Sequence, residues 1–236
     1  MNKTWTRIVI VVIAAAAVAF WVFFDRQRAP ERQMDNVLNE MPAWQVIKEQ
    51  EPALHQRILD QMAALQKAGE PEQQIIDTIQ PQILHLQMTR LQNAPDANVV
   101  NYMTINMEQT AAIQKVSDDA CFRFLYPMVK GGINPMRMLD KDLMARRMQA
   151  DADMMRAAYG KMTQAEREAA VEDVRPIMKQ LADQYGEDIQ LLQMPEKAAG
   201  KEKLSCDMVQ EMWAKVLALP EQKAAGVIRL AVSELD

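Results

Sequence analysis

Residues 52–87, PALHQRILDQMAALQKAGEPEQQIIDTIQPQILHLQ, decide the fold class. Apolar residues recur here every three or four positions, which is the spacing of one helix face, whereas a half-buried strand alternates apolar and polar residues. Gly69 and Pro71 fall between the two periodic halves, where one helix would end and the next begin. The segment therefore predicts two amphipathic helices joined by a short turn. The periodic positions are Leu54, Ile58, Met62, Leu65, Ile76, Ile79, Ile83 and Leu86.

The helical spacing continues along the chain, and no stretch alternates like a strand. We therefore expect an all-α protein. A turn cluster at residues 130–135, which contains Gly131 and Gly132, separates two helical blocks. The expected helices cover residues 30–49 with a break near Pro42, 52–68, 71–92 with a kink or break at Pro81, 96–116, 118–129, 135–160, 164–185, 202–219 and 221–235.

The N-terminal part contains an unbroken run of 17 uncharged, mostly apolar residues from Ile8 to Phe24. At 1.5 Å per residue a helix over this run spans about 25 Å, at the short end of what crosses a bilayer core. We expect residues 1–24 to form a tail and a single transmembrane anchor in contact with the lipid bilayer. Residues 25–50 would then form a juxtamembrane helical linker and residues 51–236 a compact multi-helix domain.

A cleaved signal peptide is the alternative interpretation of this run, because Ala14 to Ala17 offer small residues of the kind that signal peptidase accepts. The run continues past them through aromatic residues up to Phe24, however, which favours an uncleaved anchor. The short tail carries Lys3 and Arg7 and no acidic residue, so it is expected to stay in the cytosol. The bulk of the chain would then be extracytoplasmic, which in a bacterium places it in the periplasm, held on the inner membrane.

The charge balance argues against a nucleic-acid partner. Of the 27 basic residues two lie in residues 1–24, which contain none of the 32 acidic ones, so the remainder of the chain is clearly acidic. Phosphate backbones require a basic surface. A local basic group could touch anionic lipid headgroups, but interleaved aspartates favour a solvated helix face. The group consists of Arg137, Lys141, Arg146 and Arg147.

The chain has two cysteines, Cys121 and Cys206. Their spacing matches neither a zinc motif nor a redox CxxC motif. In an oxidising compartment two cysteines suffice for one structural disulfide, which would tie the first helical block to the last. A free catalytic thiol is the alternative, although neither cysteine has a histidine near it in sequence to act as a base.

Methionine is the compositional outlier, with 19 residues in the chain. Met144, Met148 and Met155 fall on one face of an expected helix, which favours packing in a core or in an adaptable groove. Thioethers also select Cu(I), so these three are the candidate ligands of an alternative metal site.

The inventory for catalysis is poor. His55 and His85 lie on separate expected helices without a zinc-binding spacing, and we expect His85 to be partly buried and bonded to a neighbour. None of the three serines lies in a GxSxG elbow, and no glycine-rich loop could hold a phosphate. The segment from Ser117 to Pro127 is the densest in aromatic residues; it would form a core element or border a cleft for a peptide or lipid.

Together these features predict a membrane-anchored interaction protein of the cell envelope, such as a scaffold, assembly factor or adaptor, with an envelope protein as partner and no cofactor. A methionine-rich Cu(I)-handling protein and an envelope hydrolase with an unrecognised site are the alternatives.

The anchor can be tested directly. We expect the protein to remain in the membrane fraction after a carbonate wash, because an inserted helix resists alkaline extraction. Alkaline phosphatase fused after Asp236 should be active, because that enzyme works only outside the cytosol. Release into the soluble fraction would show that the run from Ile8 to Phe24 is cleaved.

Overall fold

The computed structural model describes residues 35, 38–160 and 167–233. These residues form α-helices and short 3-10 helices and no strand, so the expected all-α class is confirmed for this part of the chain. None of the helices described is both long and apolar enough to cross a bilayer. The run from Ile8 to Phe24, on which the anchor prediction depends, lies outside the described residues, as do residues 30–34, 36–37, 164–166 and 234–235 of the expected helices.

Ten α-helices are described, together with three 3-10 helices. The 3-10 helices are η1 (Pro135–Arg137), η2 (Gly186–Leu192) and η3 (Pro195–Lys197). The α-helices are α2 (Pro42–Gln50), α3 (Pro52–Ala68), α4 (Glu72–Asn93), α5 (Asp96–Val116), α6 (Asp118–Leu125), α7 (Pro127–Lys130), α8 (Lys141–Ala158), α9 (Arg167–Tyr185), α10 (Glu202–Leu217) and α11 (Glu221–Ser233).

Proline and short polar residues set most of the helix boundaries. Helices α3 and α5 have the bounds expected from the sequence. The helix expected over residues 118–129 is instead two helices, because Pro127 lacks an N–H and disfavours helical backbone in the residue before it. The hydroxyl of Ser117 caps α6 by accepting a hydrogen bond from the Ala120 backbone N–H at 3.2 Å. Pro81 lies inside α4.

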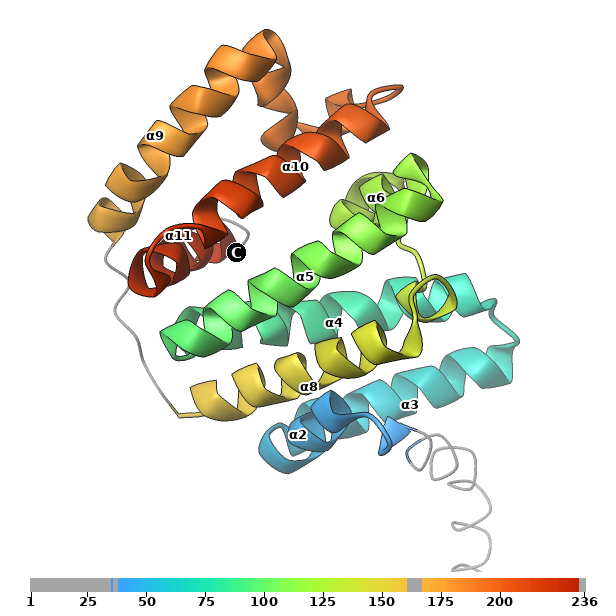
Figure 1. The fold of residues 1–236 in the computed structure, drawn as a ribbon. Helices are drawn as coiled ribbons and strands as arrows, with labels where there is room; N and C mark the ends of the chain where they lie inside the picture. Colours follow the sequence, from blue (N-terminus) through green and yellow to red (C-terminus); the bar gives the residue numbers. More distant parts are fainter. Residues whose placement is uncertain (1–34, 36–37, 161–166, 234–236) are drawn as a thin grey trace, which may run out of the picture.

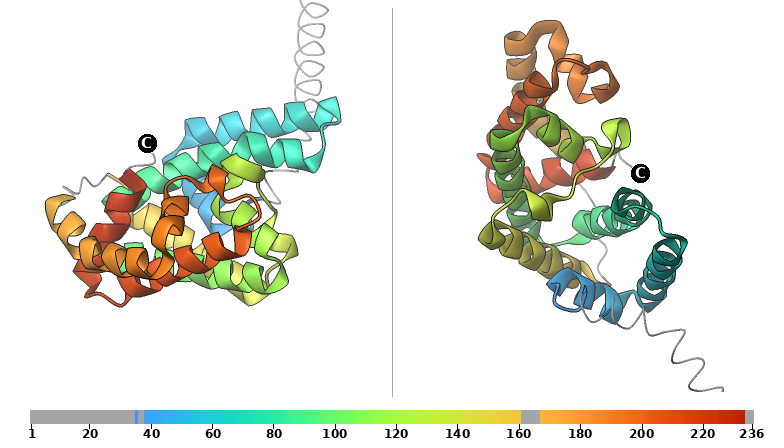
Figure 2. Two further views of the ribbon diagram at one scale, coloured as in Figure 1. Left: turned by 90° about the horizontal axis from the view of Figure 1, so that it is seen from above. Right: turned by 90° about the vertical axis from the view of Figure 1, so that its right-hand side faces the viewer.

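Helices α5 and α8 lie side by side at the centre of the molecule (Figure 1). Helices α2 and α4 pack against α8, and α3 packs against α2 and α4. On the other side α5 contacts α6, α10 and α11, and α9 covers α10 and α11. The views in Figure 2 agree that α3 and α9 lie at opposite ends of this arrangement.

The main core is built from both blocks of the chain. Met154 and Met155 of α8, Val99 of α5 and Ile228 of α11 are all fully or almost fully buried in it. Helix α2 contributes Trp44, Val46 and Ile47 to the same core. The packed unit therefore includes α2, which lies within the segment that we expected to be a juxtamembrane linker.

A second core cluster surrounds the disulfide. Cys121 of α6 and Cys206 of α10 are bonded, with their Cα atoms 6.4 Å apart, and both are fully buried next to Phe122 and Met208. The expected disulfide is therefore present in the structure. Because both sulfurs are engaged, neither cysteine is a free thiol, and the alternative of a catalytic thiol is wrong for this structure.

Removing the disulfide should destabilise the domain measurably. The bond closes a loop with a sequence separation of 85 residues, and the chain-entropy model assigns such a loop roughly 4 kcal/mol of unfolding free energy. We expect Cys121→Ser to lower the free energy of unfolding in urea by about that amount. It should also abolish the faster migration of the non-reduced protein on a denaturing gel. Maleimide labelling of both cysteines in the unfolded, unreduced wild type would contradict this prediction.

Candidate functional site

The segment between α6 and α8 forms a corner of the molecule, which we call the α7 corner and define as residues 123–138. The Arg123 guanidinium donates hydrogen bonds to the carbonyls of Gly131 at 3.2 Å and Gly132 at 2.8 Å. Lys130 pairs with Asp119 at 2.5 Å and with Glu202 of α10 at 2.9 Å. Gly132 is buried against α4, and a side chain there would lie 3.0 Å from the Gln80 amide oxygen. The hydrogen bonds of Arg123, the ion pairs of Lys130 and the close packing of Gly132 against α4 therefore fix the position of the corner.

The α7 corner exposes apolar side chains. Met128 is 86% exposed and Val129 is 42% exposed. Next to them is a shallow hollow whose polar lining comes from Arg123, Arg137, Asn134 and Gln73. Ile133 and Met138 supply its apolar lining. The segment lies beside the start of α4, where its yellow-green ribbon meets the teal one in Figure 1. The corner therefore has exposed apolar side chains and a hollow with a mixed polar and apolar lining.

A second polar cluster joins Asp35 to the first two helices. One Asp35 carboxylate oxygen accepts hydrogen bonds from Trp44 Nε1 at 3.0 Å and from His55 Nε2 at 2.9 Å, and the other accepts one from Lys48 Nζ at 2.5 Å. The Trp44 and His55 rings are in contact, with their centroids 4.7 Å apart. Burial alone would raise the pKa of Asp35, but the hydrogen bonds from Lys48, Trp44 and His55 outweigh it and hold that pKa well below its ordinary value. Asp35 is therefore an ionised anchor point for α2 and α3.

The two histidines differ from the sequence-based expectation. His85 is exposed, so the prediction that it is partly buried is wrong. His55 is the buried one, with 7% of its surface exposed. Its partner Asp35 lies 20 residues earlier in the chain, and no local motif could have indicated this pairing.

A third polar cluster lies inside the bundle. Arg147 Nε of α8 is 2.8 Å from Asp151 Oδ1, and the guanidinium carbon lies 4.2 Å from the centroid of the Tyr102 ring. Burial raises the pKa of the Tyr102 hydroxyl and of the Asp151 carboxyl. We expected Arg147 to lie on a solvated helix face, and this prediction is wrong. Its neighbour Arg146 is exposed and pairs with Glu108 at 2.5 Å.

The methionine stripe on α8 is divided between the core and its edge. Met155 is 1% exposed, whereas Met144 and Met148 are half-buried. The Met144 sulfur accepts a hydrogen bond from Gln109 Nε2 at 3.5 Å. Met144 and Met155 are eleven residues apart, which is roughly 16 Å along a helix axis. That distance disfavours one shared Cu(I) ion.

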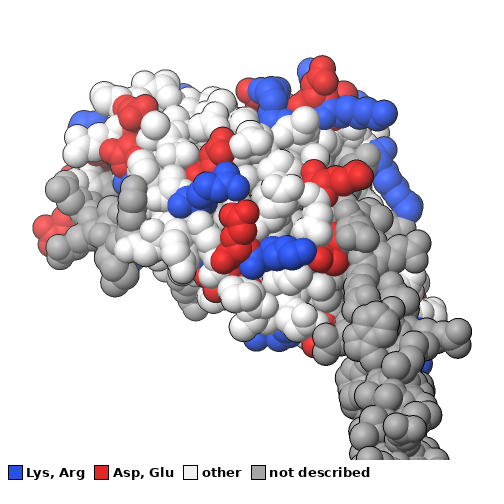
Figure 3. Space-filling view, turned by 90° about the horizontal axis from the view of Figure 1, so that it is seen from below, with Lys and Arg blue, Asp and Glu red and all other residues white. Residues whose placement is uncertain are grey.

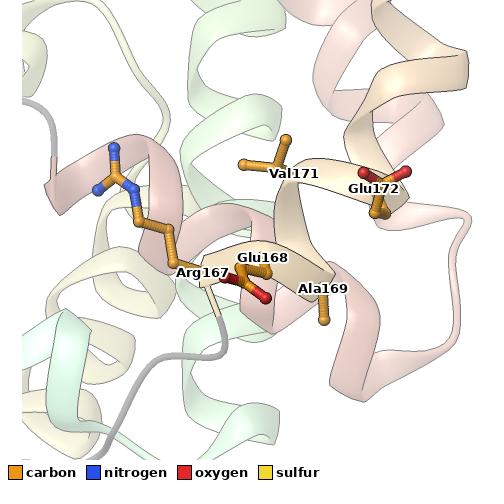
Figure 4. A pocket seen from close by; sticks show the side chains of 5 residues that line it. All are labelled: Arg167, Glu168, Ala169, Val171 and Glu172. Atoms are coloured by element: carbon orange, nitrogen blue, oxygen red, sulfur yellow. The ribbon is translucent and has the colours of Figure 1, made fainter.

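Two other surfaces offer no convergent chemistry. A hollow at the start of α9 is lined by residues of that helix alone, and the Glu168 and Glu172 carboxylates in it do not point toward one another (Figure 4). Glu172 is paired with Arg175 at 2.7 Å. On the face shown in Figure 3, acidic and basic side chains lie close together, and neither the acidic nor the basic residues form a separate patch.

Comparison with known proteins adds no assignment. No protein family, no curated protein sequence and no solved structure matches this chain.

The Asp35 cluster predicts a specific acid sensitivity. A carboxyl whose pKa is lowered on folding stabilises the fold above its unfolded pKa, and this stabilisation is lost as the pH falls below about 4. We expect Asp35→Asn to cost about 1–3 kcal/mol in urea unfolding at pH 7, because buried donors lose a charged acceptor. The difference from wild type should shrink at pH 3. The control Asp60→Asn, at an exposed position of α3, should change stability by less than about 0.5 kcal/mol. Equal effects at both sites, or no dependence on pH, would contradict this role of Asp35.

The methionine stripe can be tested by conserving its shape. We expect Met155→Leu to cost less than about 1.5 kcal/mol and Met155→Ala to cost about 2–5 kcal/mol in urea unfolding, because only the second leaves a cavity. Met128→Ala is the exposed control and should be nearly neutral. If Met155→Leu proved as damaging as Met155→Ala, the sulfur itself would matter, and metal binding would have to be reconsidered.

Proposed function

We propose that this protein is a single-pass, membrane-anchored interaction protein of the bacterial cell envelope, with its helical domain in the periplasm. It would act as a scaffold, assembly factor or adaptor that presents a rigid helical surface to a protein partner. The run from Ile8 to Phe24 supports the anchor, because its length and aromatic flanks suit a bilayer.

The disulfide is the observation that carries this proposal. Stable disulfides form in oxidising compartments and are rare in the cytosol. The bond between Cys121 and Cys206 is fully buried and joins α6 to α10, so it holds elements from the two helical blocks together. A domain fixed in this way keeps its surface shape outside the cell's reducing interior, which suits a binding platform.

The two alternatives have less support. The Cu(I) alternative needs three sulfurs at one ion, and the spacing of Met144 and Met155 on one helix disfavours this. The hydrolase alternative needs an activated nucleophile or base. Both sulfurs are bonded to each other, and His55 is engaged with Asp35 and Trp44.

In-cell photo-crosslinking tests the interaction role. We would place a photo-reactive phenylalanine at exposed apolar positions on three separate parts of the fold, namely Leu84 of α4, Val171 of α9 and Met194 between η2 and η3. A partner that occupies one face should give an adduct of one fixed mass from the positions on that face and none from the others. Adducts of many masses from all three positions would contradict a specific binding function.

A further inference from the structure

We propose that Met128 is a site of reversible oxidation, at which a hydroperoxide converts the thioether to a sulfoxide without unfolding the domain. The modification turns the most exposed of the large apolar side chains described into a polar one. The proposal goes beyond the interaction role and needs only the fold, because exposure decides which sulfur an oxidant reaches first.

The chain offers an oxidant thioethers rather than thiols. Its two cysteines are bonded to each other, so neither presents a thiolate, the form of cysteine that oxidants attack. The 19 methionines carry the remaining sulfur atoms of the chain. A two-electron oxidant that meets this protein therefore reacts first at methionine.

Burial divides the methionines sharply. Met128 is 86% exposed and Met194 is 38% exposed, and every other methionine whose burial the structure describes is half-buried or buried. At the other extreme, Met154, Met155 and Met208 have at most 1% of their surface exposed. Because the sulfur must touch the oxidant in order to react, Met128 is oxidised first and these three are oxidised last.

The reaction changes the polarity of the side chain and leaves its carbon skeleton intact. A lone pair of the Met128 sulfur attacks one oxygen of the hydroperoxide, an S–O bond forms and the O–O bond breaks. The transferred oxygen gives its proton to the departing oxygen, which leaves as water or an alcohol. Sulfur is oxidised by two electrons and the peroxide is reduced by two. The product is a polar sulfoxide whose oxygen accepts hydrogen bonds.

The α7 corner keeps its structure without help from Met128. Arg123 holds the turn at residues 131–132 through hydrogen bonds to its carbonyls, and Lys130 pairs with acidic side chains of α6 and α10. None of these contacts involves the Met128 thioether, so water can solvate a sulfoxide there. A sulfoxide at Met155 would instead place a polar oxygen in the main core, which is costly unless it finds a hydrogen-bond donor.

The same exposure makes the modification reversible. Thiol-dependent reductases return methionine sulfoxide to methionine, and they must reach the side chain to do so. Met128 lies on a one-turn helix at the surface, where a reductase can reach it while the domain stays folded. The proposal therefore requires a reductase of this class in the compartment that holds the domain.

Peptide mapping after mild oxidation tests the proposal. The folded full chain is treated with a limiting amount of hydrogen peroxide, the reaction is stopped with catalase, and tryptic peptides are analysed by mass spectrometry. Three of these peptides hold a single methionine each, namely residues 124–130 with Met128, 180–197 with Met194 and 142–146 with Met144. We expect the first peptide to gain one oxygen at least about tenfold faster than the third, with the second between them.

The same treatment in urea isolates the effect of the fold. In the unfolded chain the three peptides should gain oxygen at similar rates, because all three thioethers are then exposed. A preference for Met128 that persists in urea would assign it to the local sequence and overturn the structural argument. Similar rates for Met128 and Met144 in the folded chain would overturn the site itself.

Stability and repair test the other two parts of the proposal. Protein oxidised at Met128 alone should keep the urea midpoint of the untreated protein, and Met128→Leu should lose only the fastest phase of oxygen uptake. Methionine sulfoxide reductases of both stereospecificities should return peptide 124–130 to its original mass in the folded protein. A lowered midpoint would overturn the claim that the fold tolerates the sulfoxide, and a persistent sulfoxide would overturn its reversibility.

Discussion

Helix α5 is covered along almost its whole circumference, and this requirement arranges the helices around it. Between its ends the exposed residues are Ala97, Asn101, Glu108 and Lys115, which follow one another at four or seven positions and form one narrow line. All other faces of α5 must be covered by neighbouring helices. Each fully buried apolar side chain then contributes roughly 1.5–3 kcal/mol to the free energy of unfolding. Helices α6, α8, α10 and α11 supply this cover. The disulfide fixes two of these covering helices to each other.

Helix positions could be predicted from the sequence where local signals agree. The bounds of α3 and α5 follow from apolar periodicity together with proline and glycine at their ends. The break at Pro127 was equally local and was missed because the apolar pattern continues through it. Contacts between distant segments gave no such signal. The pairing of His55 with Asp35, and the burial of Arg147 against Tyr102, depend on how separate helices pack, which periodicity does not encode.

The candidate site shows the same division. The disulfide followed from the number of cysteines and the expected compartment, because two cysteines allow a single intramolecular pairing. The α7 corner was not predicted from the sequence, although the sequence shows that residues 120–139 contain no acidic residue. What the sequence could not show is that Met128 would be left outside the core while Phe122, six residues earlier, is buried in it. The direction of the α7 side chains depends on the backbone turn that precedes Pro127, and this turn is fixed only when the surrounding helices pack.

The disulfide also imposes an order in time on the folding of this chain. Cys121 is synthesised 85 residues before Cys206, which at about 5–20 residues per second is a delay of roughly 4–17 s. Helix α5 emerges even earlier, so its apolar surface must wait for α8, α10 and α11 before it is fully covered. During that interval Cys121 is an unpaired thiol among apolar residues, because Cys206 has not yet been synthesised. The correct disulfide therefore forms only if the Cys121 thiol is still reduced when α10 has been made.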